Sequence, residues 1–142
     1  MAVAVVDSGV LIGMADSDDE RHETARRIVR GIDRGDLPTG RVTNYVVIET
    51  LNWIHQRRDT EKARETYRRL KRSAGFEVIH APKKDLGRAL ELFETHDGLS
   101  FGDATIAAYV ERENLEFLYS FDGDFDAIRG VTRLDTATNP YD

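Results

Sequence analysis

The sequence predicts an α/β fold in which helices cover both faces of a mainly parallel sheet. Short apolar runs alternate with amphipathic segments along the whole chain of 142 residues. Strands that alternate with helices need crossover connections, and these make neighbouring strands parallel. The length is enough to close one hydrophobic core. No repeat, low-complexity block or linker interrupts the pattern, so residues 1–142 are expected to form a single domain.

The first elements follow from local patterns. Residues 2–6 are apolar and predict a strand buried on both faces, followed by a short helical turn through Leu11. Residues 18–36 predict a helix, because apolar side chains recur there at amphipathic spacing: Ala25, Ile28, Val29 and Ile32. Turn signals then lead into a short strand near 40–43.

Two helices follow in the middle of the chain. Asn44 is expected to cap a helix over 45–58. The buried stripe of this helix is expected to be Val47, Leu51 and Ile54. The basic segment 60–73 predicts a second helix, which Gly75 ends.

The last part of the chain alternates again. The predicted elements are a strand at 76–81, a helix at 83–96 that Pro82 opens, a loop at 97–102, a helix at 103–113, and strands at 116–121 and 130–134. The tail, residues 135–142, is expected to be mobile.

The composition is that of a globular protein and excludes several classes. Charged residues make up 32% and hydrophobic residues 40% of the chain. No apolar run approaches the roughly 20 residues of a membrane helix, and the N-terminus lacks the pattern of a secretory signal. There is no cysteine, which excludes disulfides and thiolate metal sites and fits a cytoplasmic protein.

Two predicted strands run directly into carboxylates. Asp7 follows the first strand, and Asp122 follows the strand over 116–121. A buried carboxylate is costly unless it has a partner. Ligand sites of parallel sheets form at the carboxyl ends of the strands, so these two side chains meet if their strands are neighbours, and they can then bind a hard cation such as Mg²⁺. The alternative is structural, with Asp7 as a helix cap and Asp122 in a turn.

Two further acids have a functional and a structural interpretation. Asp103 opens an apolar helix three residues after Ser100, which suits a helix cap as well as a metal ligand. Glu49 projects away from the expected buried stripe of its helix, which is typical of a solvated residue. Its side of the helix is nevertheless rich in aromatic and amide groups and is also suited to line a cleft: Tyr45, Asn52, Trp53 and Gln56.

Other chemistries find little support in the sequence. There is no Gly-rich phosphate loop, dinucleotide fingerprint or serine nucleophile motif. A calcium loop starting at Asp122 would need Gly and Glu where Ala127 and Arg133 stand. An aspartyl-phosphate phosphatase would need a second Asp where Gly9 follows Asp7. The histidines lie apart without ligand spacing: His22, His55, His80 and His96.

The charge is unevenly distributed. The whole chain carries −6, yet residues 57–72 hold eight basic and three acidic residues. Such a helix is suited to bind the phosphates of a nucleic acid. The candidate residues are Arg64, Arg68, Arg69 and Arg72. The alternative is a solvated helix face whose arginines pair with acids elsewhere on the chain.

Four stretches in order, "VVDSGVLI", "VVIETLNWI", "LSFGDATIAA" and "YSFDGDFDAI", resemble the PIN domain, and more closely the VapC toxin ribonucleases of VapBC toxin–antitoxin modules. The resemblance covers nearly the whole chain. It implies a three-layer α/β/α sandwich and RNA cleavage that depends on Mg²⁺ or Mn²⁺. The family's four acids fall on Asp7, Glu49, Asp103 and Asp122. The family's small hydroxyl residue falls on Ser8, and its common auxiliary Asp falls on Asp124.

This resemblance also implies roles and partners. Asp7 and Asp103 are the expected direct metal ligands, and Asp122 and Glu49 complete the pocket, bind a second metal or orient the attacking water. The expected partners are an RNA substrate, a small cognate antitoxin and a second copy of the chain, without a membrane. The alternatives are a nuclease that processes RNA outside a toxin module and an inactive metal-binding interaction module of the same fold.

Overall fold

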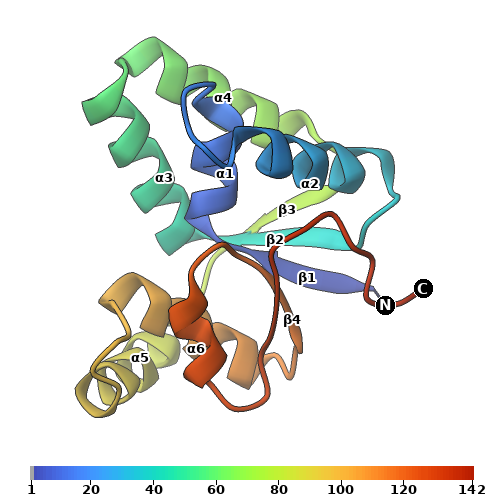
Figure 1. The fold of residues 1–142 in the computed structure, drawn as a ribbon. Helices are drawn as coiled ribbons and strands as arrows, with labels where there is room; N and C mark the ends of the chain where they lie inside the picture. The colour runs from blue at the N-terminus through green and yellow to red at the C-terminus, as the bar shows by residue number, and fades with distance from the viewer. Residues whose placement is uncertain (1) are drawn as a thin grey trace.

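The structure is a computed structural model that describes residues 2–142 (Figure 1). Within these residues, five parallel strands form one sheet in the order β3-β2-β1-β4-β5. The strands are β1 (Val3–Val6), β2 (Thr39–Thr43), β3 (Phe76–Ile79), β4 (Phe117–Tyr119) and β5 (Thr132–Leu134). The helices are α1 (Ser8–Ala15), α2 (His22–Arg34), α3 (Asn44–Arg57), α4 (Thr60–Arg72), α5 (Lys83–Thr95), α6 (Phe101–Arg112) and the short 3₁₀ helix η1 (Gly123–Ala127).

The helices form one layer on each face of the sheet. Figure 1 shows α1 to α4 on one side and α5 with α6 on the other. The strand β1 lies in the middle and is buried along its whole length, because its side chains meet helices on both faces. This arrangement confirms the predicted three-layer α/β/α sandwich with a parallel sheet.

The order of the strands brings distant parts of the sequence together. In the register of β1 with β4, Val5 lies opposite Leu118 and Val6 lies opposite Tyr119. The residues that follow these strands therefore emerge side by side at the carboxyl edge of the sheet. The backbone N–H of Asp7 still donates to the carbonyl of Tyr119 over 3.0 Å.

Two details of α3 differ from the expectation. Thr43 caps the helix, since its hydroxyl accepts from the N–H of Val46 over 3.2 Å. The amide oxygen of Asn44 instead accepts from the N–H of Ala81 over 2.8 Å, which fixes the end of β3. The fully buried stripe is Val46, Thr50 and Ile54, whereas Val47 and Leu51 are only partly buried. The buried face of α3 differs from the expected one because the helix packs on α1 and on α4 as well as on the sheet.

The C-terminal tail is held against the sheet, contrary to the expectation that it is mobile. The hydroxyl of Tyr141 donates to the carbonyl of Val3 over 3.1 Å, and its ring packs edge-on against Phe117. The hydroxyl of Tyr119 donates to the carbonyl of Thr138 over 2.6 Å. Among residues 2–142, no helix is both long and apolar enough to cross a membrane.

Candidate active site

Acidic residues from four segments line one hollow of about 380 Å³ at the carboxyl edge of the sheet. The end of β1 leads into α1 there, α3 and α6 begin beside it, and the segment after β4 closes it. The lining residues are Asp7, Ser8, Gly9, Glu49, Ser100, Asp103, Phe121 and Asp122. The structure therefore places all four predicted acids around one hollow.

Asp7 lines this hollow and is buried. Its Oδ1 accepts from the N–H of Ser8 over 2.8 Å, and its Oδ2 accepts from the hydroxyl of Ser120 over 2.7 Å. Burial raises the pKa of Asp7 from 3.8 to about 6, although both hydrogen bonds act to lower it, and the charges of Glu49 and Asp122 raise it further. The residue is thus both the cap of α1 and part of the acidic hollow.

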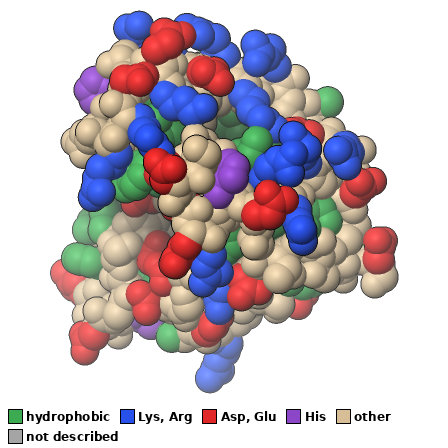
Figure 2. Space-filling model, turned by 45° about the horizontal axis from the view of Figure 1, so that its top comes forward, with side chains coloured by type: hydrophobic (Ala, Val, Ile, Leu, Met, Phe, Trp, Pro, Cys, Tyr) green, Lys and Arg blue, Asp and Glu red, His purple; other side chains and the backbone are tan. Residues whose placement is uncertain are grey.

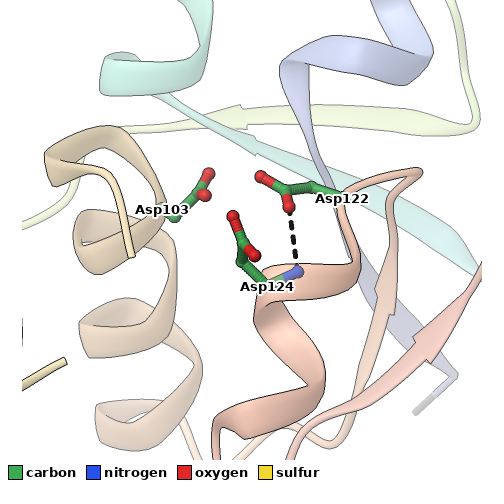
Figure 3. Close-up of side chains that lie close together, drawn as sticks. All are labelled: Asp103, Asp122 and Asp124. Atoms are coloured by element: carbon green, nitrogen blue, oxygen red, sulfur yellow. Dashed lines mark hydrogen bonds between the residues drawn. The ribbon is translucent and has the colours of Figure 1, made fainter. Parts of the chain in front are cut away.

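Three carboxylates converge beside Asp7. Oxygens of Asp103, Asp122 and Asp124 all lie within 4.8 Å of one another. Figure 3 shows these side chains pointing toward one another, Asp103 from α6, Asp122 from the residue that precedes η1 and Asp124 from η1 itself. The N–H of Asp124 donates to Oδ1 of Asp122 over 2.9 Å, which brings these two side chains into position.

The proximity of the three acids affects their titration. Burial, a hydrogen bond shared with Asp122 and the charge of Asp7 raise the pKa of Asp103 well above its ordinary 3.8. Partial burial acts to raise the pKa of Asp122, but hydrogen bonds from Asp103 and Asp124 and the charge of Arg133 lower it overall. The carboxylates therefore repel one another when both are ionised, and a bound cation would relieve this repulsion.

The spacing of these oxygens suits a hard cation. Ligand oxygens lie roughly 2.0–2.1 Å from Mg²⁺ and roughly 2.3–2.6 Å from Ca²⁺, so two oxygens on opposite sides of one ion are about 4.2 Å apart for Mg²⁺ and about 4.6–5.2 Å apart for Ca²⁺. The three oxygens, all within 4.8 Å of one another, are close to this range. The three acids that meet this spacing are Asp103, Asp122 and Asp124, whereas both oxygens of Asp7 accept hydrogen bonds from serines. The arrangement thus fits a divalent-metal site and gives Asp124 a more central place than the sequence did.

Glu49 lies at the rim of the hollow and is exposed, so the solvated and the cleft-lining interpretations both describe it. Its Oε1 accepts a hydrogen bond from the hydroxyl of Ser8. A Cβ added at Gly102 would lie 3.0 Å from Oε2 of Glu49, so the absence of a side chain there leaves room for this carboxylate. Ser8, which the resemblance included as an auxiliary residue, therefore links Glu49 to the start of α1.

Ser120 is the residue that sequence reasoning missed. It is fully buried, donates to Asp7 as described, and its Oγ accepts from the N–H of Asp122 over 3.0 Å. The guanidinium of Arg133 donates to its carbonyl over 3.2 Å. The one sign of its role in the sequence is that a hydroxyl residue interrupts the apolar run before Asp122. The sequence does not show its partner, because Asp7 is 113 residues away along the chain.

The four candidate RNA-binding arginines lie in two different environments. Arg64, Arg68 and Arg72 are exposed and spaced by four residues, so they share one face of α4. Arg68 pairs with Glu61 of the same helix over 3.1 Å. Arg69 instead pairs with Asp33 of α2 over 3.1 Å, as the structural alternative proposed. Figure 2 shows basic side chains over this layer of helices, with acidic ones among them.

Comparison with known proteins gives the class. The family model for the PIN domain matches residues 4–131, so this chain belongs to the PIN domain family. Two relatives are each 29% identical to this chain over 124 residues. Both are named 23S rRNA-specific endonuclease VapC20, and they come from Mycobacterium tuberculosis strains CDC 1551 / Oshkosh and ATCC 25618 / H37Rv. The match covers 86% of this chain and 91% of each relative.

Solved structures agree with this assignment. The crystal structure of Mycobacterium tuberculosis VapC20, described as a Sarcin-Ricin loop cleaving toxin, superposes with a TM-score of 0.77 at 26% identity, covering 92% of this chain and 97% of that one. VapBC2 from Rickettsia felis, bound to a DNA fragment from its promoter, superposes with a TM-score of 0.70 at 12% identity, covering 93% and 97%. The second likeness concerns the fold alone.

Proposed function

We propose that this chain is a metal-dependent endoribonuclease and the toxin of a type II toxin–antitoxin module. The observation that carries the proposal is the convergence of Asp103, Asp122 and Asp124 beside buried Asp7 in a PIN domain. The likeness to an rRNA-specific endonuclease over most of the chain supports RNA as the substrate.

In this proposal, Asp103, Asp122 and Asp124 hold Mg²⁺ or Mn²⁺, with Asp7 adding negative charge behind them. When bound, such a cation supplies Lewis-acid assistance to the phosphodiester and lowers the pKa of water. Glu49, at the exposed rim, is placed to orient the attacking water and to accept its proton. Ser120 and Ser8 hold the carboxylates of Asp7 and Glu49 in place.

The test is cleavage of ribosomal RNA by the purified chain with EDTA, Mg²⁺ or Mn²⁺. Cleavage with either metal and none with EDTA is expected. Metal binding without cleavage would favour the inactive interaction module. Cleavage without growth arrest on expression would favour an RNA-processing nuclease outside a toxin module.

Replacing Glu49 with Gln is expected to lower the cleavage rate about 100-fold or more, because the amide cannot accept a proton. The melting temperature should change little, since the side chain is exposed. Rates and melting curves measured beside Glu20→Gln, a change at another exposed Glu outside the hollow, give the comparison. Wild-type cleavage rates in Glu49→Gln would support the structural interpretation, in which Glu49 is a solvated residue without a catalytic role.

The exposed face of α4 is proposed to hold the RNA backbone, because the acidic hollow itself repels phosphates. Arg64→Glu combined with Arg68→Glu is expected to weaken RNA binding in metal-free buffer. Each lost phosphate contact should flatten the dependence of log affinity on log salt by roughly 0.7 for a single strand. Arg69 is left intact because it pairs with Asp33.

The control for this charge swap is Lys83→Glu with Lys84→Glu, which changes the net charge equally at exposed positions of α5. Affinity titrated at several salt concentrations should fall more, and with a flatter slope, for the α4 variant. Equal effects of the two swaps would contradict a specific contact along α4.

Two protein partners are proposed, an antitoxin and a second copy of the chain. A small antitoxin is proposed because the fold recurs in chains crystallised as VapBC complexes. A homodimer is proposed because Leu90 and Phe93 of α5 expose 49% and 46% of their surface on one helix face. Light scattering of the purified chain tests the dimer, and the mass of a single chain would contradict it.

A further inference from the structure

Two aromatic rings, one in the lining of the acidic hollow and one a helical turn from Glu49, each contact an arginine. Phe121 lines the hollow directly, between Ser120 and Asp122, and the guanidinium carbon of Arg21 lies 5.0 Å from the centre of its ring. Trp53 lies on α3 one helical turn after Glu49, and the guanidinium carbon of Arg57 lies 5.4 Å from its ring. These distances are within the range of cation–π contacts.

The two rings are related to α1 in different ways. A Cβ added at Gly9 or Gly13 would come within 4.0 and 3.8 Å of the Phe121 ring, so this ring lies along the glycine side of α1. Ser8 contacts Glu49, so α3 approaches another side of the same helix. The start of α1, which carries Ser8 and Gly9 in the lining of the hollow, therefore lies between Phe121 and the Glu49 face of α3.

The arginines on these rings are free of carboxylates. Among residues 2–142, neither Arg21 nor Arg57 takes part in an ion pair, although the protein is acidic overall. The neighbouring Arg58, in contrast, pairs with Asp16 and Asp18. Arg21 and Arg57 thus retain their full charge and hydrogen-bonding capacity for a ligand, while the rings limit where they can go.

We propose that Phe121 with Arg21, and Trp53 with Arg57, hold the nucleotides on either side of the phosphodiester that the acidic hollow cleaves. This inference rests on the proposed ribonuclease function. Unpaired bases stack on aromatic rings and on guanidinium planes, and the guanidinium also contacts phosphate. A base can take the place of the guanidinium on the ring or stack on its outer face, and both placements change the surroundings of the ring.

This arrangement accounts for two features that the four acids leave unexplained. The aromatic and amide-rich side of α3 becomes the wall along which one strand segment lies, with Asn52 and Gln56 exposed beside Trp53. The two free arginines place positive charge at the border of a hollow that would otherwise repel RNA. Stacking tolerates any base, so these residues give a preference for unpaired nucleotides rather than for a sequence.

The first test uses the fluorescence of Trp53, which is the single tryptophan of the chain. A short oligouridylate titrated into metal-free protein is expected to quench this fluorescence to saturation. Inorganic polyphosphate, which has the charge of a nucleic acid backbone without bases, is expected to leave it nearly unchanged. Equal quenching by both polyanions, or quenching by neither, would overturn the inference.

The second test separates the rings from the arginines. Phe121→Leu and Trp53→Leu should each weaken oligouridylate binding about 5- to 150-fold, the range of one lost base stack, without changing the salt slope. Arg21→Ala and Arg57→Ala should weaken binding and also flatten the slope by roughly 0.7 each. The control is Arg30→Ala. Arg30 is an exposed residue of α2 that lies about 13 Å further along the helix axis than Arg21.

These measurements need no cleavage, so the two proposals fail in different ways. Suppose that the chain cleaves RNA, shows no base-dependent quenching, and binds oligouridylate equally well as Phe121→Leu and Trp53→Leu variants. This outcome would support the ribonuclease function and contradict the stacking of bases on Phe121 and Trp53. Quenching and the expected salt slopes without RNA cleavage by any metal would support base stacking on Phe121 and Trp53 as part of a single-strand binding surface. The same outcome would contradict the ribonuclease function.

Discussion

Replacing Asp7 with Asn is expected to lower RNA cleavage by at least about 100-fold while stabilising the metal-free protein above about pH 6. The rate falls because one carboxylate of the acidic hollow is lost. The stability rises because Asp7 is buried and ionised at that pH, beside the charges of Glu49 and Asp122. Asn keeps the oxygen that accepts from the N–H of Ser8.

The sign of the pH dependence follows from the raised pKa of Asp7. The folded state binds this proton up to about pH 6, whereas the unfolded chain releases it near 3.8. The free energy of unfolding of the wild type therefore falls as the pH rises from about 4 to about 6, by up to about 3 kcal/mol at about 1.4 kcal/mol per pH unit. Asn does not titrate, so the gain in the free energy of unfolding of Asp7→Asn over the wild type is absent below about pH 4 and complete above about pH 6.

Melting curves of wild type and Asp7→Asn in EDTA, taken across this pH range, measure the effect. Asp36→Asn is the control, because Asp36 is exposed and makes no ion pair among residues 2–142. The gain is reduced by the hydroxyl of Ser120, which loses the acceptor it has in Oδ2 of Asp7. Full cleavage by Asp7→Asn would refute the catalytic assignment of this residue.

Replacing Ser120 with Ala is expected to lower both stability and activity, although this residue lies below the surface of the hollow. The change leaves Oδ2 of Asp7 and the N–H of Asp122 without their partner. Each unsatisfied buried group costs about 1–3 kcal/mol. Loss of a residue that orients the carboxylates should lower the cleavage rate about 10- to 100-fold.

A shift of the pH profile separates positioning from general destabilisation. The hydroxyl of Ser120 lowers the pKa of Asp7, so its removal raises that pKa, and the rate should rise with pH at higher pH values than in the wild type. Ser120→Thr keeps the hydroxyl and should keep the wild-type profile, even if the added methyl group lowers the melting temperature. An unchanged profile in Ser120→Ala would leave the serine a purely structural role.

Three of the acids that line the hollow stand out from the local sequence pattern. Asp7 and Asp122 interrupt apolar strands, and Asp103 begins an apolar helix, so the residue types alone indicated their positions. Glu49 does not stand out in this way, because helical periodicity places it on the surface whether or not that surface lines a hollow. The resemblance of four ordered motifs to the PIN domain predicted a role for it in the site, and Glu49 is one of the residues that line the hollow.

The alternation of strands and helices, the family, and the acids at the carboxyl edge of the sheet could all be predicted from the amino-acid sequence. Three contacts became visible only in the folded chain: Asp124 joins Asp103 and Asp122 in one cluster, Ser120 links Asp7 to Asp122, and Arg69 faces α2. Periodicity indicates which face of an element is buried, but it does not indicate how that element is rotated against its neighbours. Contacts between residues far apart in the chain depend on strand order, register and helix rotation, which packing of the whole core sets.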